Sequence, residues 1–166
     1  SKKGEYHSNT HDFIFKDSVT VVAKDYTILT DNMHYNSNSE TTYFFGPSYI
    51  VSDNKTIYCE NGWYNTKTDI SQFQENSYIT TKNYLLRGDS LYYNKNLGYG
   101  KAIKNVEVID TVENLTVFGG FAEYFEKEEI IEITETPLLQ ILFEQDTLFM
   151  HADKFISQQK LAEKRV

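Results

Sequence analysis

The sequence predicts an all-β protein built from repeats, in which antiparallel strands stack into a slab and bend as they cross it. Three observations support this fold class. Aromatic residues make up 15% of the 166 residues, with 13 Tyr and 11 Phe, and such residues suit a pleated, half-buried surface. Only two prolines occur, and polar, Asn-rich clusters separate the apolar runs, as expected for strands joined by turns. A two-strand unit of 29 to 31 residues recurs about five times along the chain.

The first strand of each unit is recognised by an aliphatic residue that is followed, seven positions later, by an aromatic anchor. The anchors are spaced by 29, 29, 31 and 31 residues, and a further, partial copy ends at Tyr6. The aliphatic residues are Ile28, Ile57, Leu86, Val117 and Leu148, and the anchors are Tyr35, Tyr64, Tyr93, Tyr124 and Phe155. Agreement at near-constant spacing favours a true repeat over chance alternation in an ordinary sandwich.

A break is predicted inside each first strand. A second apolar residue, such as Met33 or Leu91, stands two positions before the anchor, whereas the aliphatic residue stands seven before it. Because a strand alternates its faces with a period of two, both residues can face inward only if the phase shifts by one between them. We therefore expect a bulge or corner at the intervening dipeptides. These are Thr30-Asp31, Cys59-Glu60, Gly88-Asp89, Gly119-Gly120 and Met150-His151.

The second strand of each unit follows a short polar turn, such as the turn at residues 36–39. Nine positions after the anchor stand Phe15, Phe44, Phe73, Ala102 and Ile133, and fifteen after it stand Val21, Ile50, Ile79, Val108 and Leu139. These two columns have the same parity, so they can face one core. Between them lies a polar or Gly position that predicts a second corner, at Asp17, Gly46, Glu75, Lys104 and Glu135. Strands joined by short turns pair antiparallel, so stacked units would form one continuous hydrophobic core or channel.

The repeat domain is expected to occupy residues 1–157, and a polar tail is expected at residues 158–166. The chain opens partway through a unit, and neither end shows a capping unit. Because repeat arrays need polar caps at their ends, this pattern indicates a fragment of a longer array.

The overall charge argues against a nucleic acid partner. The net charge is −8, the pI is near 5.0, and no Lys/Arg cluster offsets this balance, so a phosphate backbone would be repelled. The sequence contains no run of about 18 apolar residues, the length that a membrane-spanning helix would need. The single cysteine, Cys59, excludes an intramolecular disulfide, which is compatible with the cytosol and equally with an exported protein.

Motifs for catalysis or cofactor binding are not found. His7 and His11 lie in a polar turn near Asp12, where a solvated loop is favoured over a metal pair, and His34 and His151 lack ligand partners at metal-site spacing. Cys59 has no nearby His, so it is expected to be a small core residue. We therefore predict a non-enzymatic protein without a metal or cofactor. An enzyme that acts on glycans would need a cleft with two carboxyls about 5–10 Å apart, and no such pair stands out. The aromatic residues fit either core packing or an apolar groove that accepts acyl chains.

Two strand motifs resemble the organic-solvent-tolerance (OstA)-like family, the superfamily of the periplasmic lipopolysaccharide-transport bridge. They are Leu86-Arg-Gly-Asp-Ser-Leu-Tyr-Tyr-Asn94 and Lys101-Ala-Ile-Lys-Asn-Val-Glu-Val108, and they alternate along the chain in weaker copies. The resemblance covers residues 1–157 and is greatest for the longer, Bacteroidetes-type versions. The fourth unit departs from the pattern, because Gly119-Gly120 replaces Gly-Asp and Glu135-Thr-Pro137 interrupts the second strand.

The resemblance implies a β-jellyroll slab whose hydrophobic interior binds the acyl chains of lipopolysaccharide or lipid A without catalysis. It implies an exported protein in the periplasm or at the outer membrane, with its signal peptide outside this fragment. Besides the lipid, the implied partners are further copies or other transport-bridge proteins, joined head-to-tail through edge strands. The rival hypothesis is a structural or interaction scaffold of the cell envelope that has a filled core and no lipid cavity.

The residues in the inward columns are the predicted lipid contacts. They are Ile28, Met33, Phe44, Ile50, Ile57, Phe73, Ile79, Leu86, Leu91, Val108, Val117 and Ile133.

Overall fold

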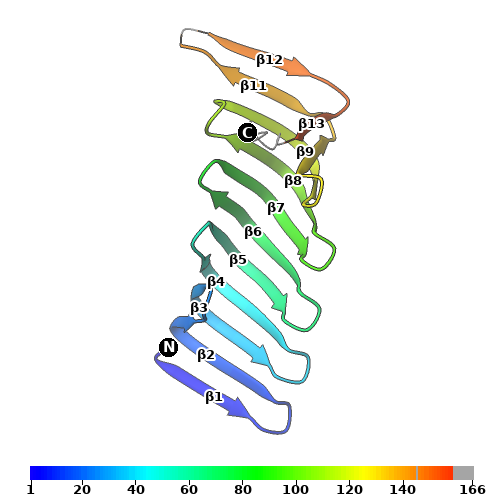
Figure 1. Cartoon of the computed structure of the whole chain (residues 1–166). Coiled ribbons are helices and arrows are strands. Elements are labelled where there is room, and N and C mark those ends of the chain that lie inside the picture. The colour runs from blue at the N-terminus through cyan, green and yellow to red at the C-terminus, as the bar shows by residue number, and fades with distance from the viewer. Residues whose placement is uncertain (145, 159–166) are drawn as a thin grey trace, which may run out of the picture.

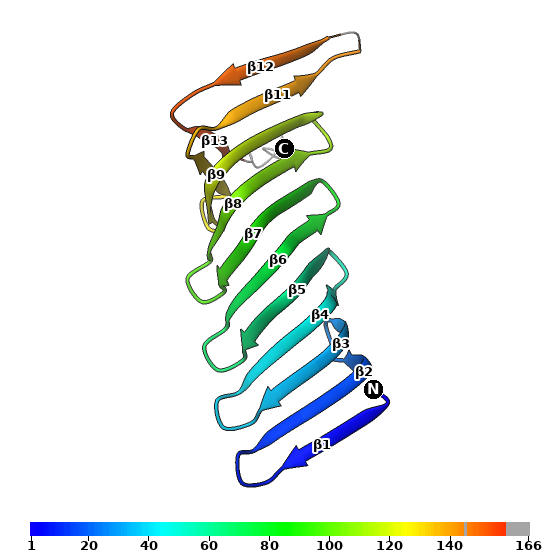
Figure 2. The ribbon, with the colours of Figure 1, turned by 180° about the vertical axis from the view of Figure 1, so that it is seen from behind.

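The computed structural model describes residues 1–144 and 146–158, which form one open antiparallel sheet of 13 strands and contain no helix (Figures 1 and 2). Each strand from β1 to β9 pairs with the next one along the chain, β10 pairs with β13, and β11 pairs with β9 and β12. The strands are β1 (Lys3–His7), β2 (Asp12–Val22), β3 (Thr27–Asn36), β4 (Thr41–Val51), β5 (Lys55–Asn65), β6 (Ile70–Thr81), β7 (Tyr84–Asn94), β8 (Tyr99–Asp110), β9 (Leu115–Phe125), β10 (Ile130–Thr134), β11 (Leu138–Leu142), β12 (Thr147–His151) and β13 (Phe155–Gln158). The predicted all-β repeat fold is confirmed.

Every long strand is bent at a corner, as the change of phase predicts. Between β2 and β3 the register jumps from the pair Lys16 and Asn32 to the pair Val19 and Thr30, so two residues of β2 oppose one of β3. The same jump recurs in every pair up to β8 with β9. In β2 both bulged residues take left-handed backbone angles, Asp17 with φ 61° and Ser18 with φ 59°, and the bulged pairs of β6 and β8 do the same, whereas in β4 only Gly46 does. Such a two-against-one bulge bends the strand and re-aims its side chains.

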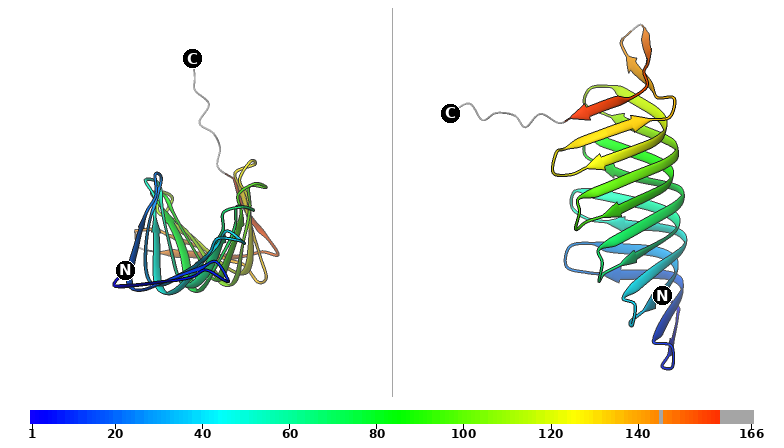
Figure 3. Two further views of the ribbon diagram at one scale, coloured as in Figure 1. Left: turned by 90° about the horizontal axis from the view of Figure 1, so that it is seen from below. Right: turned by 90° about the vertical axis from the view of Figure 1, so that its right-hand side faces the viewer.

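The corners divide the sheet into two arms that face each other. Viewed along the stack, the strands trace a trough that is closed at the corners and open along one side (Figure 3). One arm ends in hairpins that include the two-residue turns 24–25, 53–54 and 82–83, and we call it the short-turn arm. The other arm ends in four-residue turns such as 37–40 and 66–69, and we call it the long-turn arm. The open side between the arm tips is the mouth.

Asparagine side chains hold the turns of the long-turn arm, directly after the anchors. The side-chain oxygen of Asn65 accepts a hydrogen bond from the backbone N–H of Thr68 at 2.8 Å. Its amide nitrogen donates to the carbonyl oxygen of Ser39, 2.8 Å away in the preceding turn. Asn36 also accepts bonds from its own turn. These bonds fix each turn and link it to the turn of the neighbouring unit, which explains the polar residues after each anchor.

The predicted inward columns are confirmed as continuous rows across the sheet. In the short-turn arm, one row of direct cross-strand partners runs through Val21, Ile28, Ile50, Ile57, Ile79, Leu86, Val108, Val117 and Leu139. In the long-turn arm, a second row runs through Phe15, Met33, Phe44, Gly62, Phe73, Leu91, Ala102, Ala122 and Ile133. Because these side chains are direct neighbours, burial on one strand supports burial on the next.

The repeat alignment predicted from the sequence is wrong by two residues in the last unit. Leu139 pairs with Met150 rather than Leu148, so Met150 holds the aliphatic position. Phe155 pairs with Ile133 and therefore stands in the row of Leu91 rather than in the row of the anchors, where Ser157 stands instead. The predicted break at Met150-His151 accordingly falls at residues 152–154, between β12 and β13. Beyond the aliphatic row, the β11–β12 hairpin has three residue pairs, from Gln140 with Phe149 to Leu142 with Thr147, whereas the β8–β9 hairpin has two. This extra pair moves the aliphatic position of the last unit by two residues.

The fourth unit is interrupted where Glu135-Thr-Pro137 was expected to weaken pairing. Its second strand is split into β10 and β11, which pair with the two halves of β9. Strand β13 extends through Gln158, one residue past the predicted domain boundary. The remainder of the predicted tail, residues 159–166, lies outside the described residues, and the boundary itself stays a prediction.

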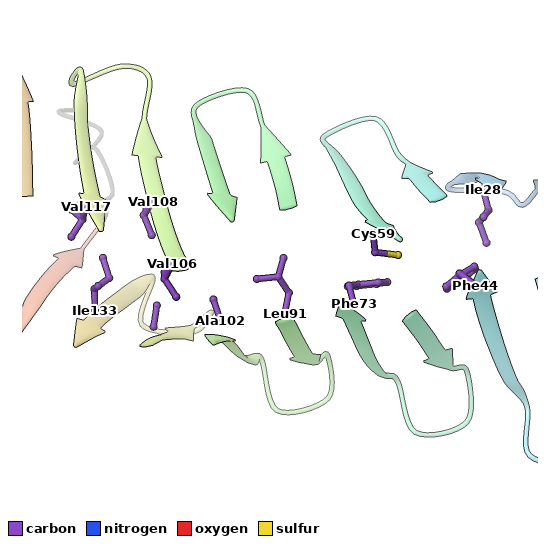
Figure 4. Packing of buried hydrophobic residues seen from close by; sticks show 11 residues of the cluster. Ile28, Phe44, Cys59, Phe73, Leu91, Ala102, Val106, Val108, Val117 and Ile133 are labelled. Atoms are coloured by element: carbon purple, nitrogen blue, oxygen red, sulfur yellow. The ribbon is translucent and has the colours of Figure 1, made fainter. Parts of the chain in front are cut away.

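The core lies along the corner, where side chains of the two arms meet (Figure 4). Phe44, Phe73 and Leu91 from the long-turn arm are at most 4% exposed, and Ile133 is fully buried. Small residues of the short-turn arm lie next to the corner and make room for them, namely Thr30, Ser48, Cys59, Ser77 and Gly88. Their hydroxyls are satisfied locally, as in the 2.7 Å hydrogen bond between Thr30 and Ser48.

Candidate functional site

The candidate site is the inner face of the trough, and all twelve predicted residues lie in its apolar interior. Eight of them are buried: Ile28, Met33, Phe44, Phe73, Leu91, Val108, Val117 and Ile133. Four are half-buried: Ile50, Ile57, Ile79 and Leu86. All except Met33 belong to one continuous cluster or pack against it. The structure therefore brings the predicted residues together along one surface, and their contact with lipid stays a prediction.

Burial changes from the corner to the mouth. On β5, Cys59 next to the corner is 1% exposed, whereas Ile57, two residues closer to the mouth on the same face, is half-buried. The same half-burial holds for Ile50, Ile79 and Leu86 in the same row. The interior next to the corner is thus filled by the protein's own side chains. Apolar surface that stays partly exposed lies nearer the mouth, at Ile50, Ile57, Ile79 and Leu86.

A row of tyrosines lines the mouth on the long-turn arm. The anchors Tyr64 and Tyr93 stand on the inner face, and their cross-strand neighbours Ser71 and Gly100 are small. A Cβ atom added at Gly100 would lie 3.4 Å from Cδ2 of Tyr93, so the ring of Tyr93 packs over this glycine. Aromatic faces therefore extend the apolar lining to the tip of this arm.

The tyrosine hydroxyls are held by carboxylates in the turns. Tyr64 donates a hydrogen bond to Asp69 at 2.6 Å, and Tyr93 donates one to Glu126 at 2.8 Å. Burial, together with the bond to Asp69, raises the pKa of Tyr64 to about 12. Burial and Glu126 raise the pKa of Tyr93 further above its ordinary value. Both hydroxyls stay protonated near neutral pH, so each ring presents an apolar face inward and a fixed polar end at the rim.

Side chains from the short-turn arm reach across the mouth, which the sequence reasoning missed. The ammonium of Lys55, at the start of β5, lies 5.9 Å from the ring centroid of Tyr93, at the far end of β7. Tyr26, at the equivalent place before β3, is close enough to Tyr64 to contribute to its raised pKa. Both contacts join the tip of one unit to the anchor of the next unit. A repeat alignment shows which positions of different units are equivalent. It does not show contacts between non-equivalent positions of neighbouring units, so these contacts could not be predicted from it.

The outer face differs from the inner face in its packing. Tyr49, Tyr58 and Tyr78 are direct neighbours across β4, β5 and β6, and successive ring centroids lie 5.0 Å apart. Because these rings pack against one another, the ladder stabilises the pairing of β4, β5 and β6.

The part of the chain that the structure describes holds neither a reactive thiol nor a metal-binding cluster. Cys59 is buried, and burial raises its pKa to about 12, so its thiol is not a nucleophile near neutral pH. Within residues 1–144 and 146–158, no three His, Cys, Asp or Glu side chains are placed to hold a metal ion. None of the described segments is a helix long and apolar enough to cross a membrane.

Comparison with known proteins gives one family and one fold. The model of the OstA-like protein family matches residues 1–31 and 25–89, which together make up more than half of the chain. Seventeen solved chains also match. One is the crystal structure of LptH from Pseudomonas aeruginosa, described as the LptA homologous periplasmic component of the conserved lipopolysaccharide transport device. Its TM-score is 0.58 at 11% identity, over 74% of this chain and 92% of that chain, which shows a shared fold. No curated protein matches the sequence.

Proposed function

Because the chain belongs to the OstA-like protein family, we propose that it is a non-catalytic, lipid-binding segment of a lipopolysaccharide-transport bridge. The matched fold of LptH, a periplasmic component of such a device, supports this function and a location in the periplasm or at the outer membrane. The observation that carries the proposal is the apolar row of the short-turn arm, which runs without interruption from β2 to β11 and is half-buried from β4 to β7, at Ile50, Ile57, Ile79 and Leu86.

The proposed ligand is the acyl part of lipopolysaccharide or lipid A. Burial of each methylene contributes about 0.8 kcal/mol, so ten methylenes contribute about 8 kcal/mol before the costs of association. This is enough to bind a lipid to a protein whose net charge of −8 repels anionic headgroups. The acyl chains would lie against Ile50, Ile57, Ile79 and Leu86, opposite the tyrosine row. Phe44, Phe73 and Leu91, buried beside the corner, then form the floor beneath them.

The proposed protein partners add strands at the two ends of the sheet. At the first end, β1 pairs with only part of β2, and Val22 at the far end of β2 is 77% exposed. At the other end, β12 has an open edge and exposes Leu148, Phe149 and Met150. Such edges recruit further strands. Further copies of the chain, or other bridge proteins, would thereby continue the trough head-to-tail.

The scaffold hypothesis remains the second candidate, because the packed corner leaves no room for a ligand beside Phe44 or Ile133. The two functions differ in whether the mouth binds lipid. We would titrate the protein with fluorescent lipid A and compare two variants, Ile57→Asp on the inner face and Leu29→Asp on the outer face. Leu29 is 45% exposed and serves as the matched control. Phe44 and Phe73 are unsuitable for this test because a buried charge there would unfold the protein.

Saturable binding that Ile57→Asp abolishes and Leu29→Asp preserves would support the lipid-bridge function. Both variants should keep the β-sheet circular dichroism spectrum of the parent protein. If the folded parent protein does not bind lipid A, or if Ile57→Asp binds it as well as the parent, the scaffold hypothesis is correct.

A further inference from the structure

Lys55 places a positive charge over the mouth of the trough. It lies two residues before Ile57 and therefore on the same, inner side of the short-turn arm. Its side chain is exposed and extends across the mouth, where the ammonium meets the face of Tyr93 at 5.9 Å. A ligand whose acyl chains lie against the Ile57 row would have its polar headgroup at this level.

The charge of Lys55 is not neutralised by a carboxylate. Among the described residues, the ion pairs within 4.0 Å join other groups, so Lys55 has an aromatic ring in place of a counter-ion. The hydroxyl of Tyr93 is already bonded to Glu126, on the side of the long-turn arm. An exposed contact between an ammonium and a ring is weak, on the order of 0.5–1 kcal/mol, and charge-assisted hydrogen bonds to an anion are stronger.

The position of Lys55 is occupied by tyrosine in both neighbouring units. Tyr26 and Tyr84 stand, like Lys55, two residues before the aliphatic residue of their unit. The second unit thus has a positively charged side chain at the position where both neighbouring units have a tyrosine. The first three hairpins of the short-turn arm each contain a lysine, namely Lys24, Lys55 and Lys82. The first two of these hairpins also contain a carboxylate, Asp25 and Asp53, whereas the later hairpins contain carboxylates such as Glu113 and Glu144 and no lysine.

We propose that Lys55 binds a phosphate group of the lipid headgroup and so makes the site selective for phosphorylated lipids over neutral lipids with the same acyl chains. This inference rests on the proposed lipid-binding function. The ammonium has three donors and can leave the ring of Tyr93 for a phosphate oxygen at the mouth. Lys24 and Lys82 lie on the flanking hairpins, about two strand spacings or roughly 9.6 Å away on either side. They place further ammonium groups along the rim, next to the carboxylates Asp25 and Asp53.

The test compares lipid A that carries two phosphates with the same lipid after removal of both phosphates. Lys55→Gln removes the charge, Lys55→Tyr restores the residue of the neighbouring units, and Lys55→Arg keeps the charge. Lys67→Gln, in an exposed turn of the long-turn arm, is the control for a general loss of positive charge. Because Lys55 and Lys67 are both exposed, all four variants should keep the melting temperature of the parent protein.

We expect Lys55→Gln and Lys55→Tyr to weaken binding of phosphorylated lipid A about three- to tenfold, as for a partly exposed charge pair. Binding of the dephosphorylated lipid should not change, and Lys55→Arg and Lys67→Gln should bind both lipids normally. The selectivity should shrink in 1 M salt, where the Debye length is about 3 Å. If the parent protein binds both lipids equally and Lys55→Gln changes neither affinity, the inference is overturned while lipid binding stands. If the parent protein binds neither lipid, the proposed lipid-binding function is refuted, and the inference about Lys55 is refuted with it.

Discussion

Replacement of Phe44 by alanine tests whether the two arms are packed together at the corner. The Phe44 side chain is 1% exposed and lies between Met33 and Gly62 in its row. Because Gly62 has no side chain to move into the space, the cavity left by Phe44→Ala would persist. A Phe→Ala change at such a site costs about 3–5 kcal/mol in the free energy of unfolding. If the arms instead stood apart, the same side chain would be solvent-exposed and the cost would fall below about 1 kcal/mol.

Urea unfolding measures this difference directly. A chain of this size has a slope of about 2 kcal/mol per molar urea, so the midpoint should fall by about 1.5–2.5 M. Unfolding can be followed by circular dichroism and by the fluorescence of Trp63, the single tryptophan, and coincidence of the two curves would support a two-state transition. Leu29→Ala on the outer face is the control and should shift the midpoint by about 0.5 M or less, because Leu29 is already 45% exposed. A comparable small shift for Phe44→Ala would refute the packed corner and indicate a channel that stays open without lipid.

Gly119→Ala should destabilise the fold by about 1–3 kcal/mol, because the added Cβ would lie 2.6 Å from Cγ2 of Ile133, and an unchanged melting temperature would contradict this packing. Hydrogen bonds, with that of the Thr10 side chain the largest contributor, hold the pKa of Asp12 well below its ordinary value of 3.8. The ionised form is therefore favoured in the folded state, and its stabilisation is present above that pH and lost as the pH falls further. Asp12→Asn should accordingly be less stable than the parent at pH 7 and equally stable in strong acid, and a difference independent of pH would count against this linkage. Cys59, with a pKa raised to about 12, should resist alkylation by iodoacetamide at pH 8 until urea unfolds the protein, and fast labelling of the native state would argue against its burial.

The rows and corners could be predicted from the sequence because both follow from whether two residues of a strand are separated by an odd or an even number of positions. A strand has a period of two, so Ile28 and Tyr35, seven residues apart, cannot share a face without a bulge, and the structure has that bulge beside Asp31. The error in the last unit arose because Phe155 was matched by its aromatic character. Aromatic residues also occupy the row next to the anchors, at Phe44, and chemical type alone does not distinguish the two rows.

The depth of each row and the contacts across the mouth could not be predicted in this way. Phe44 and Ile57 both face inward, but how far each is buried depends on the angle between the arms, which no pattern along the chain specifies. The contact of Lys55 with Tyr93 depends on the tilt of the strands, which brings the tip of one unit opposite the anchor of the next. The sequence therefore predicted the predominantly apolar character of the inner face, and the structure adds where the lining is open and where it is charged.

The unbroken rows across the sheet have a consequence for the length of the molecule. Because the strand pairs from β2 to β9 repeat the same register around the bulge, the trough keeps one cross-section along these strands. Each unit adds two strand spacings, about 9.6 Å, along the stack. Duplication or loss of a 29-residue stretch between equivalent positions, such as Tyr35 and Tyr64, would lengthen or shorten the protein by this step and leave every row in phase. The number of two-strand units therefore sets the length of the sheet along the stack.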